Sequence, residues 1–141
     1  MIARIIADCL LVFPEESIPE IGFLSNLELP IQSSKLVDAK EKPAYFVTEF
    51  EEDGTRFHVN AVQREITKEY CPDSWIVDLI YLNYEKLKSL NLEEIVFTFV
   101  YEWVDQCNFD YELKTIKKIS KMNAILCVTC TQYRNHPSKK E

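Results

Sequence analysis

The stretch VFTFVYEWVD at residues 96–105 constrains the fold more than any other part of the chain. If it forms a strand, one face carries Phe97, Phe99, Tyr101 and Trp103, and the other carries Val96, Thr98, Val100, Glu102 and Val104. A strand with one face in water alternates apolar and polar residues, but both faces are largely apolar here. We therefore expect a strand covered on both sides, or a strand whose aromatic face packs against a partner.

Five further segments have the patterns of strands. Residues 2–13 place apolar side chains at every odd position from Ala3 to Phe13. Asp53-Gly54 is a favoured two-residue hairpin turn, which predicts strands at about 44–51 and 55–62. Residues 124–133 predict a final strand. Alternation at Leu27, Leu29 and Ile31 suggests a short strand, followed to residue 42 by an exposed loop or an edge strand.

Three segments have the patterns of helices. Pro14 suits the start of a short helix or of two turns, which Pro19 would end. A longer helix is expected from about residue 74, capped by Asp73 or Ser74. Residues 109–124 show the strongest helical pattern, with Asp110 and Glu112 in the first turn, lysines later and Asn123 as the stop.

The expected order is β-α-β-β-β-α-β-α-β, in a single domain over residues 1–141 with a polar tail from about residue 134. Helices inserted among hairpin strands predict an α+β fold. We expect a mostly antiparallel sheet with the helices packed on one face, and a ferredoxin-like core. With all helices on one face, the other face of residues 96–104 is left uncovered by the chain, and its four aromatics would form an interaction surface. If helices cover both faces, the aromatics are core.

The charge is acidic and uneven. The formal net charge is −7, divided into −13 over residues 1–112 and +6 over residues 113–141. A field of this sign repels phosphate backbones and anionic lipid, so we expect neither nucleic acid nor membrane as a ligand. The sequence shows no secretory signal pattern and no apolar run long enough to span a membrane, and its five cysteines are an odd number. We therefore expect a cytoplasmic protein with reduced thiols.

Candidate catalytic and metal-binding groups all have simpler structural interpretations. Cys127 and Cys130 form a C-x-x-C inside an expected strand, which favours buried structural cysteines over a redox or zinc site. His58 has no recognisable catalytic partners. Acid pairs such as Glu15/Glu16 and Glu93/Glu94 lie at expected turns, where water screens them. We therefore predict no enzyme activity, no cofactor and no metal.

Acidic residues interleaved with aromatic ones are the remaining candidates for function. Tyr and Trp often anchor protein interfaces, and nearby carboxylates steer a cationic partner. The same residues would also suit an ordinary strand end and helix cap. The residues that we predict to bind a partner are Glu49, Glu51, Glu52, Asp53, Tyr101, Glu102, Trp103, Asp105 and Asp110.

Four segments together resemble an uncharacterised bacterial family, domain of unknown function 4279. They are ADCLLVFPEESIPEIGFLSNLELP, SWIVDLIYLNYEKLKSLN, EEIVFTFVYEW and LKTIKKISKMNAILCVTCTQY, which cover most of the chain. The chain departs from the family pattern in placing Gly22 before Phe23-Leu24, and in carrying Cys127 and Cys130 on the last strand. The resemblance implies an α+β fold and assigns no catalytic residues.

The leading hypothesis is a small acidic binding protein. In its specific form the chain is a bacterial immunity protein that neutralises a basic toxin domain of nuclease type by covering its active site. The alternative is a homo-oligomeric structural or regulatory domain, for instance a homodimer that pairs its aromatic faces. An enzyme whose cleft is built from dispersed residues such as His58 is the third hypothesis.

Overall fold

The computed structural model describes residues 2–30, 47–63 and 71–133. Its centre is a five-stranded sheet in the order β2-β3-β1-β4-β5. The strands are β1 (Ile2–Val12), β2 (Val47–Asp53), β3 (Arg56–Gln63), β4 (Glu94–Trp103) and β5 (Ile125–Gln132). All neighbouring strands are antiparallel except β4 and β5, which are parallel. The fold is α+β with a mostly antiparallel sheet, as the sequence predicts.

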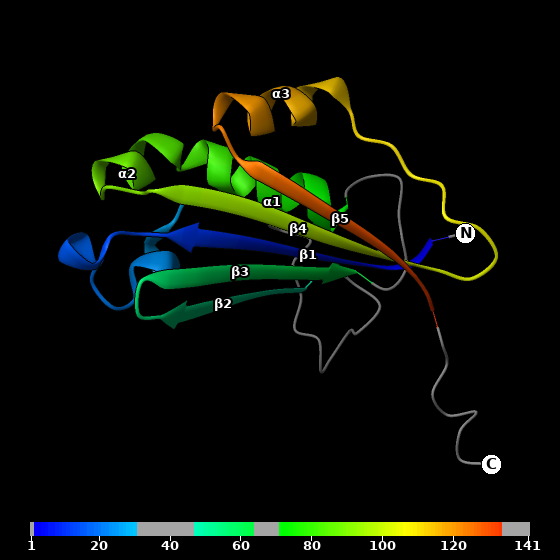
Figure 1. Ribbon diagram of the computed structural model, residues 1–141, viewed down its shortest axis with the longest axis horizontal. Coiled ribbons are helices and arrows are strands. Elements are labelled where there is room, and N and C mark those ends of the chain that lie inside the picture. Colours follow the sequence, from blue (N-terminus) through cyan, green and yellow to red (C-terminus); the bar gives the residue numbers. More distant parts are fainter. Residues whose placement is uncertain (1, 31–46, 64–70, 134–141) are drawn as a thin grey trace, which may run out of the picture.

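Three α-helices lie on one face of this sheet (Figure 1). They are α1 (Pro72–Leu82), α2 (Tyr84–Ser89) and α3 (Leu113–Lys121), and two short 3-10 helices, η1 (Glu15–Ser17) and η2 (Phe23–Asn26), follow β1. Strands β3 and β4 flank β1 and are joined through α1, so they form a split β-α-β unit of the ferredoxin-like type. Strand β5 extends the sheet through a second crossover that contains α3.

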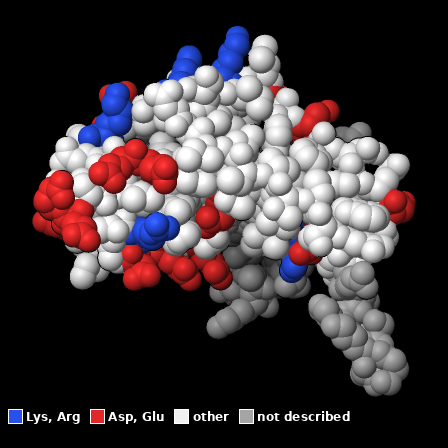
Figure 2. Space-filling view, in the orientation of Figure 1, with Lys and Arg blue, Asp and Glu red and all other residues white. Residues whose placement is uncertain are grey.

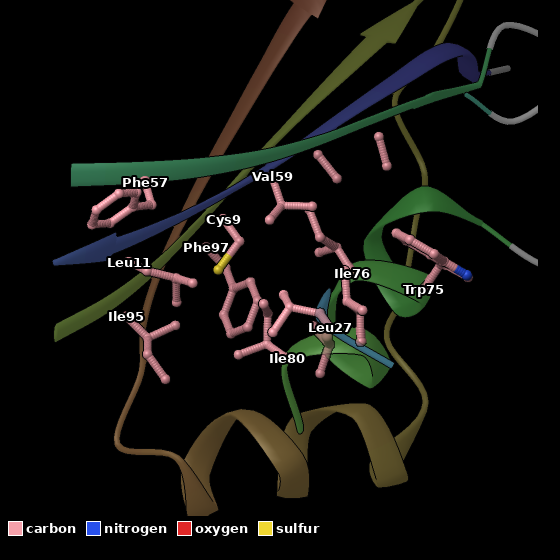
Figure 3. Packing of buried hydrophobic residues seen from close by; sticks show 14 of the residues in the cluster. Cys9, Leu11, Leu27, Phe57, Val59, Trp75, Ile76, Ile80, Ile95 and Phe97 are labelled. Carbon is pink, nitrogen blue, oxygen red and sulfur yellow. The ribbon is translucent and has the colours of Figure 1, made fainter. Parts of the chain in front are cut away.

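The aromatic positions of β4 belong to the core. Phe97, Phe99 and Tyr101 have no exposed surface, and they lie on the sheet face that the helices cover. The odd positions of β1 from Ile5 to Leu11 are buried on the same face, as their alternation predicts, and so is Phe13 just after the strand. Figure 3 shows side chains from the central strands, including Cys9, Val59 and Phe97, directed toward Ile76 and Ile80 of α1. The helices therefore cover the aromatic face, whereas Val96, Thr98, Val100 and Glu102 on the opposite face are half-buried, so neither expectation for residues 96–105 holds as stated.

The long helix expected from residue 74 is two helices. Asn83 ends α1 because its side chain bonds the Leu79 carbonyl (2.8 Å) and pairs with the backbone of Glu28, accepting from its N–H (2.9 Å) and donating to its carbonyl (2.8 Å). The helix also begins earlier than expected, with Cys71 as N-cap and Pro72 in the first turn, rather than at Asp73 or Ser74. Pro72 favours this start because a missing N–H costs nothing at the first helical position.

Helix α3 is shorter than expected. It begins at Leu113, after an N-cap at Glu112, so Asp110 lies in the preceding loop rather than in the first turn. It ends as predicted beside Asn123, which has a φ of +50°. Residues 27–30 carry no strand, and the rest of the segment expected to run to residue 42 lies outside the described residues, as does the tail from residue 134.

Candidate functional site

The structure divides the predicted partner-binding residues between two ends of the sheet. Strands β2 and β4 run in opposite directions within the sheet, because three antiparallel pairings separate them. Strand β2 ends at Asp53, and β4 ends at Trp103. Asp53 therefore lies near the start of β4, whereas Glu102 and Trp103 lie at its far end. The nine residues do not form one site.

The end that contains the β2–β3 turn gathers carboxylates from three segments. The strand register places Asp53 opposite Arg56, Arg56 opposite Val12, and Val12 opposite Glu94. Glu93 continues this row, since its N–H donates to the Val12 carbonyl (2.8 Å). We call the exposed acids of this region the acidic end: Glu15, Glu16, Glu51, Asp53, Glu93 and Glu94. Figure 2 shows acidic side chains concentrated over the end where η1 and the β2–β3 turn lie.

Local structure holds the acidic end in place. Gly54 has a φ of +59°, which the tight turn after Asp53 requires. Glu52 points to the helix-covered face, and its carboxylate accepts hydrogen bonds from the backbone N–H groups of Gly22 (2.6 Å) and Leu24 (3.2 Å). Glu52 thus anchors the segment around η2 rather than facing a partner, while Glu49, Glu51 and Asp53 are exposed.

The other end contains a buried polar cluster that the sequence did not reveal. The Tyr101 hydroxyl lies 2.7 Å from Asp73 Oδ2 and 2.8 Å from the Tyr111 hydroxyl. Burial raises the pKa of the Asp73 carboxyl, and the hydrogen bonds from Tyr101 and Ser74 lower it in part. Burial also raises the pKa of the Tyr101 hydroxyl far above its ordinary value. No pattern could have signalled a contact between residues 28 positions apart.

Tyr101 is consequently inaccessible to a partner. Its ring is fully buried and stacks on Phe109, with ring centroids 4.0 Å apart. Its expected role as an interface anchor is therefore wrong for this structure, because α1 and the loop before α3 cover that face of β4. Trp103 is half-buried, and Asp105 and Asp110 are exposed.

Glu102 lies on the opposite sheet face and has a partner within the chain. Arg4 faces it directly across β1 and β4, and the guanidinium donates to both carboxylate oxygens at 2.8 Å. The hydrogen bond to Glu102 raises the pKa of Arg4. Fork-like pairs of this kind fix geometry, so Glu102 joins two strands instead of presenting a free charge.

His58 makes a further polar contact with Asp8 on the same face. Its Nδ1 lies 3.1 Å from Asp8 Oδ1. Burial raises the pKa of Asp8, and the hydrogen bond to His58 opposes that rise. A pocket of about 530 Å³ is present elsewhere, lined by Tyr81, Tyr84, Glu85, Lys88, Lys121 and Asn123. His58 does not line this pocket, so this pocket is not the catalytic cleft that the third hypothesis requires.

The cysteines of the C-x-x-C are exposed, which corrects the expectation that they are buried. They lie on opposite faces of β5, opposite Thr98 and Tyr101 of β4, as a spacing of three requires. Both are accessible because β5 is an edge strand. Over residues 2–30, 47–63 and 71–133, no group of three or more His, Cys, Asp or Glu side chains is arranged to hold a metal ion. Within the same ranges, no helix has the length and apolar character to cross a membrane.

Comparison with known proteins shows a similarity to a solved structure. No family model matches the chain, and no curated protein matches it either, so the resemblance to domain of unknown function 4279 stays a prediction. A crystal structure of MupZ from Pseudomonas fluorescens aligns over 98% of this chain and 93% of that one, with 13% identity and a TM-score of 0.45.

Proposed function

We propose that this chain is a small binding protein whose acidic end engages a cationic surface on another protein. The observation that carries the proposal is the convergence of exposed carboxylates from η1, the β2–β3 turn and the start of β4. Concentrated charge of one sign steers an oppositely charged partner and speeds association. These acids come from three separate segments, and in the sequence alone they look like ordinary solvated turns.

The specific partner in this proposal is a basic toxin domain of nuclease type, which the chain neutralises as an immunity protein. A nuclease binds the phosphate backbone with lysine and arginine side chains, so its cleft carries the opposite charge to the acidic end. A rigid row of carboxylates on strand ends and a tight turn can occupy such a cleft with little ordering cost, because the fold already fixes their backbone positions.

The proposal assigns partner binding to the acidic end, a different set of residues from the one that the sequence predicts. Glu51 and Asp53 remain candidates from the sequence, and Glu15, Glu16, Glu93 and Glu94 join them. Asp105 and Asp110 lie at the far end of the sheet and supply a matched control, because they are exposed acids outside the acidic end.

The test is a titration with a purified basic nuclease domain encoded by a neighbouring gene, measured by calorimetry and by residual nuclease activity. We expect the wild-type chain to bind with a Kd below about 1 µM and to inhibit cleavage. The double variant Glu93→Lys/Glu94→Lys should raise Kd by at least about tenfold, which corresponds to about 1.4 kcal/mol. The control Asp105→Lys/Asp110→Lys should stay near the wild-type value. Loss of binding in the control alone would contradict the proposal.

A further inference from the structure

The two edges of the sheet differ sharply in how they are protected. Strand β2 carries an acid at four of its seven positions, a common protection against unwanted strand pairing. Strand β5 forms the other edge, and residues 124–133 contain no charge, no proline and no glycine. Seven of the eight β5 residues are exposed, and Leu126 is half-buried.

The backbone of β5 is oriented to accept another strand. The Tyr133 N–H donates to the Trp103 carbonyl of β4 (2.6 Å). Because the N–H and C=O of one residue point to the same side of a strand, and successive residues alternate, the odd positions of β5 direct their backbone toward β4. The even positions, from Leu126 to Gln132, direct theirs toward the free edge. Within the described residues no strand lies beyond that edge.

An apolar flank of α3 adjoins the same edge. Leu113 is 67% exposed and Ile116 is 40% exposed, and Val128 of β5 is 42% exposed. Lys118 bonds Asp78 of α1 (2.7 Å), which fixes the opposite flank of α3 against the helical layer. At helical spacing, Leu113 and Ile116 therefore face away from α1. The edge strand and the helix flank together present an uncharged, apolar side.

We propose that this side is a homodimer interface, in which the β5 strands of two copies pair antiparallel across a twofold axis. Pairing would join the two sheets into one continuous sheet and would bring the exposed flanks of both α3 helices together above it. The β5 edge and α3 flank suit a second copy because an uncharged apolar surface is complementary to itself, and a twofold contact uses the same patch on both partners.

The distribution of charge also favours a second copy at this side. Residues 124–133, which include all of β5, contain no charged side chain, so pairing two copies places no like charges against each other along the two strands. The acidic strand β2 lies at the opposite edge of each sheet, so the twofold contact keeps the two acidic edges apart. This proposal does not depend on the toxin-binding function, and it differs from pairing through the aromatic face, which is buried.

The test compares two lysine substitutions by sedimentation velocity over a range of concentrations. Val128→Lys places a charge on the β5 edge, and Phe50→Lys places one on the β2 edge, at a residue 40% exposed on the same sheet face. We expect the wild type and Phe50→Lys to dimerise, and Val128→Lys to dimerise at least about tenfold more weakly. Melting curves of both variants check that each one folds.

Hydrogen exchange supplies a readout specific to strand pairing. In the dimer, amide protons of Leu126, Val128, Cys130 and Gln132 should gain protection as concentration rises, whereas those of the odd β5 positions should be protected throughout. A wild type that stays monomeric, or a dimer unaffected by Val128→Lys, would overturn the proposal. High salt should weaken binding at the acidic end, because salt screens charges, but it should not weaken the dimer. One of the two proposals can therefore be contradicted without the other.

Discussion

Replacing Tyr101 by Phe tests the buried cluster with the smallest change in shape. The substitution removes the hydroxyl that lies 2.7 Å from Asp73 Oδ2 and 2.8 Å from the Tyr111 hydroxyl, and it keeps the stacked ring. Asp73 is only 6% exposed, so water does not readily replace the lost donor. A hydrogen bond to a charged group contributes about 1.5–3 kcal/mol. We expect a loss of about 2 kcal/mol, or roughly 6 °C in Tm for a chain of this size.

The pH dependence of this loss follows from the pKa of Asp73. Burial raises the folded-state pKa of this carboxyl above its ordinary value of 3.8, and the bond from Tyr101 lowers it in part. Tyr101→Phe therefore raises the folded-state pKa further. Ionised Asp73 then costs more folding free energy in the variant, so the loss should be fully present at neutral pH. It should shrink as the pH falls through the raised pKa and approach its minimum below 3.8.

The assay is chemical denaturation of both proteins at neutral and acidic pH, with Tyr111→Phe as control. That variant leaves the bond between Tyr101 and Asp73 intact, so it should cost only about 0.5–1.5 kcal/mol and depend less on pH. A loss for Tyr101→Phe that is below about 0.5 kcal/mol, or that grows as the pH falls, would refute the reasoning.

Three further substitutions have expected outcomes from local geometry, each measured by denaturation. Phe97→Ala should cost about 3–5 kcal/mol, because Phe97 is fully buried under α1 and leaves a cavity. Asn83→Ala should cost about 1–3 kcal/mol, because it removes the hydrogen bonds that the buried Asn83 side chain makes with the backbone of Glu28 and with the Leu79 carbonyl. Gly54→Ala should cost about 1–2 kcal/mol through its φ of +59° alone, since no atom lies near the added methyl group; Gly54→Asn, which tolerates that φ better, should cost less.

Much of the fold was predictable because its signals are local. The alternation in β1, the hairpin turn after Asp53 and the stop at Asn123 each depend on residues within a few positions of one another. The two turn residues are Gly54 and Thr55, one position later than predicted. Where prediction failed, a distant partner decided the outcome. The break at Asn83 depends on Glu28, which lies 55 positions earlier, and no propensity scale contains that contact.

The candidate site was less predictable, because its composition depends on which strand ends meet. Glu93 and Glu94 looked like a solvated pair until the register of β1 with β4 placed them beside the β2–β3 turn. Tyr101 looked like an interface anchor because its strand alternates aromatic residues, and periodicity does not say which face the helices cover. The exposed C-x-x-C was mistaken for core for a related reason, since the position of a strand at the edge of the sheet is a property of the topology.

The most direct test of the account is to map the surface that contacts a basic nuclease domain by NMR chemical-shift changes. The account predicts that the largest changes fall on the amides of η1, the β2–β3 turn and residues 93–94, and that they diminish as salt is added. Changes confined to Trp103 and residues 105–110, with the acidic end unaffected, would contradict it.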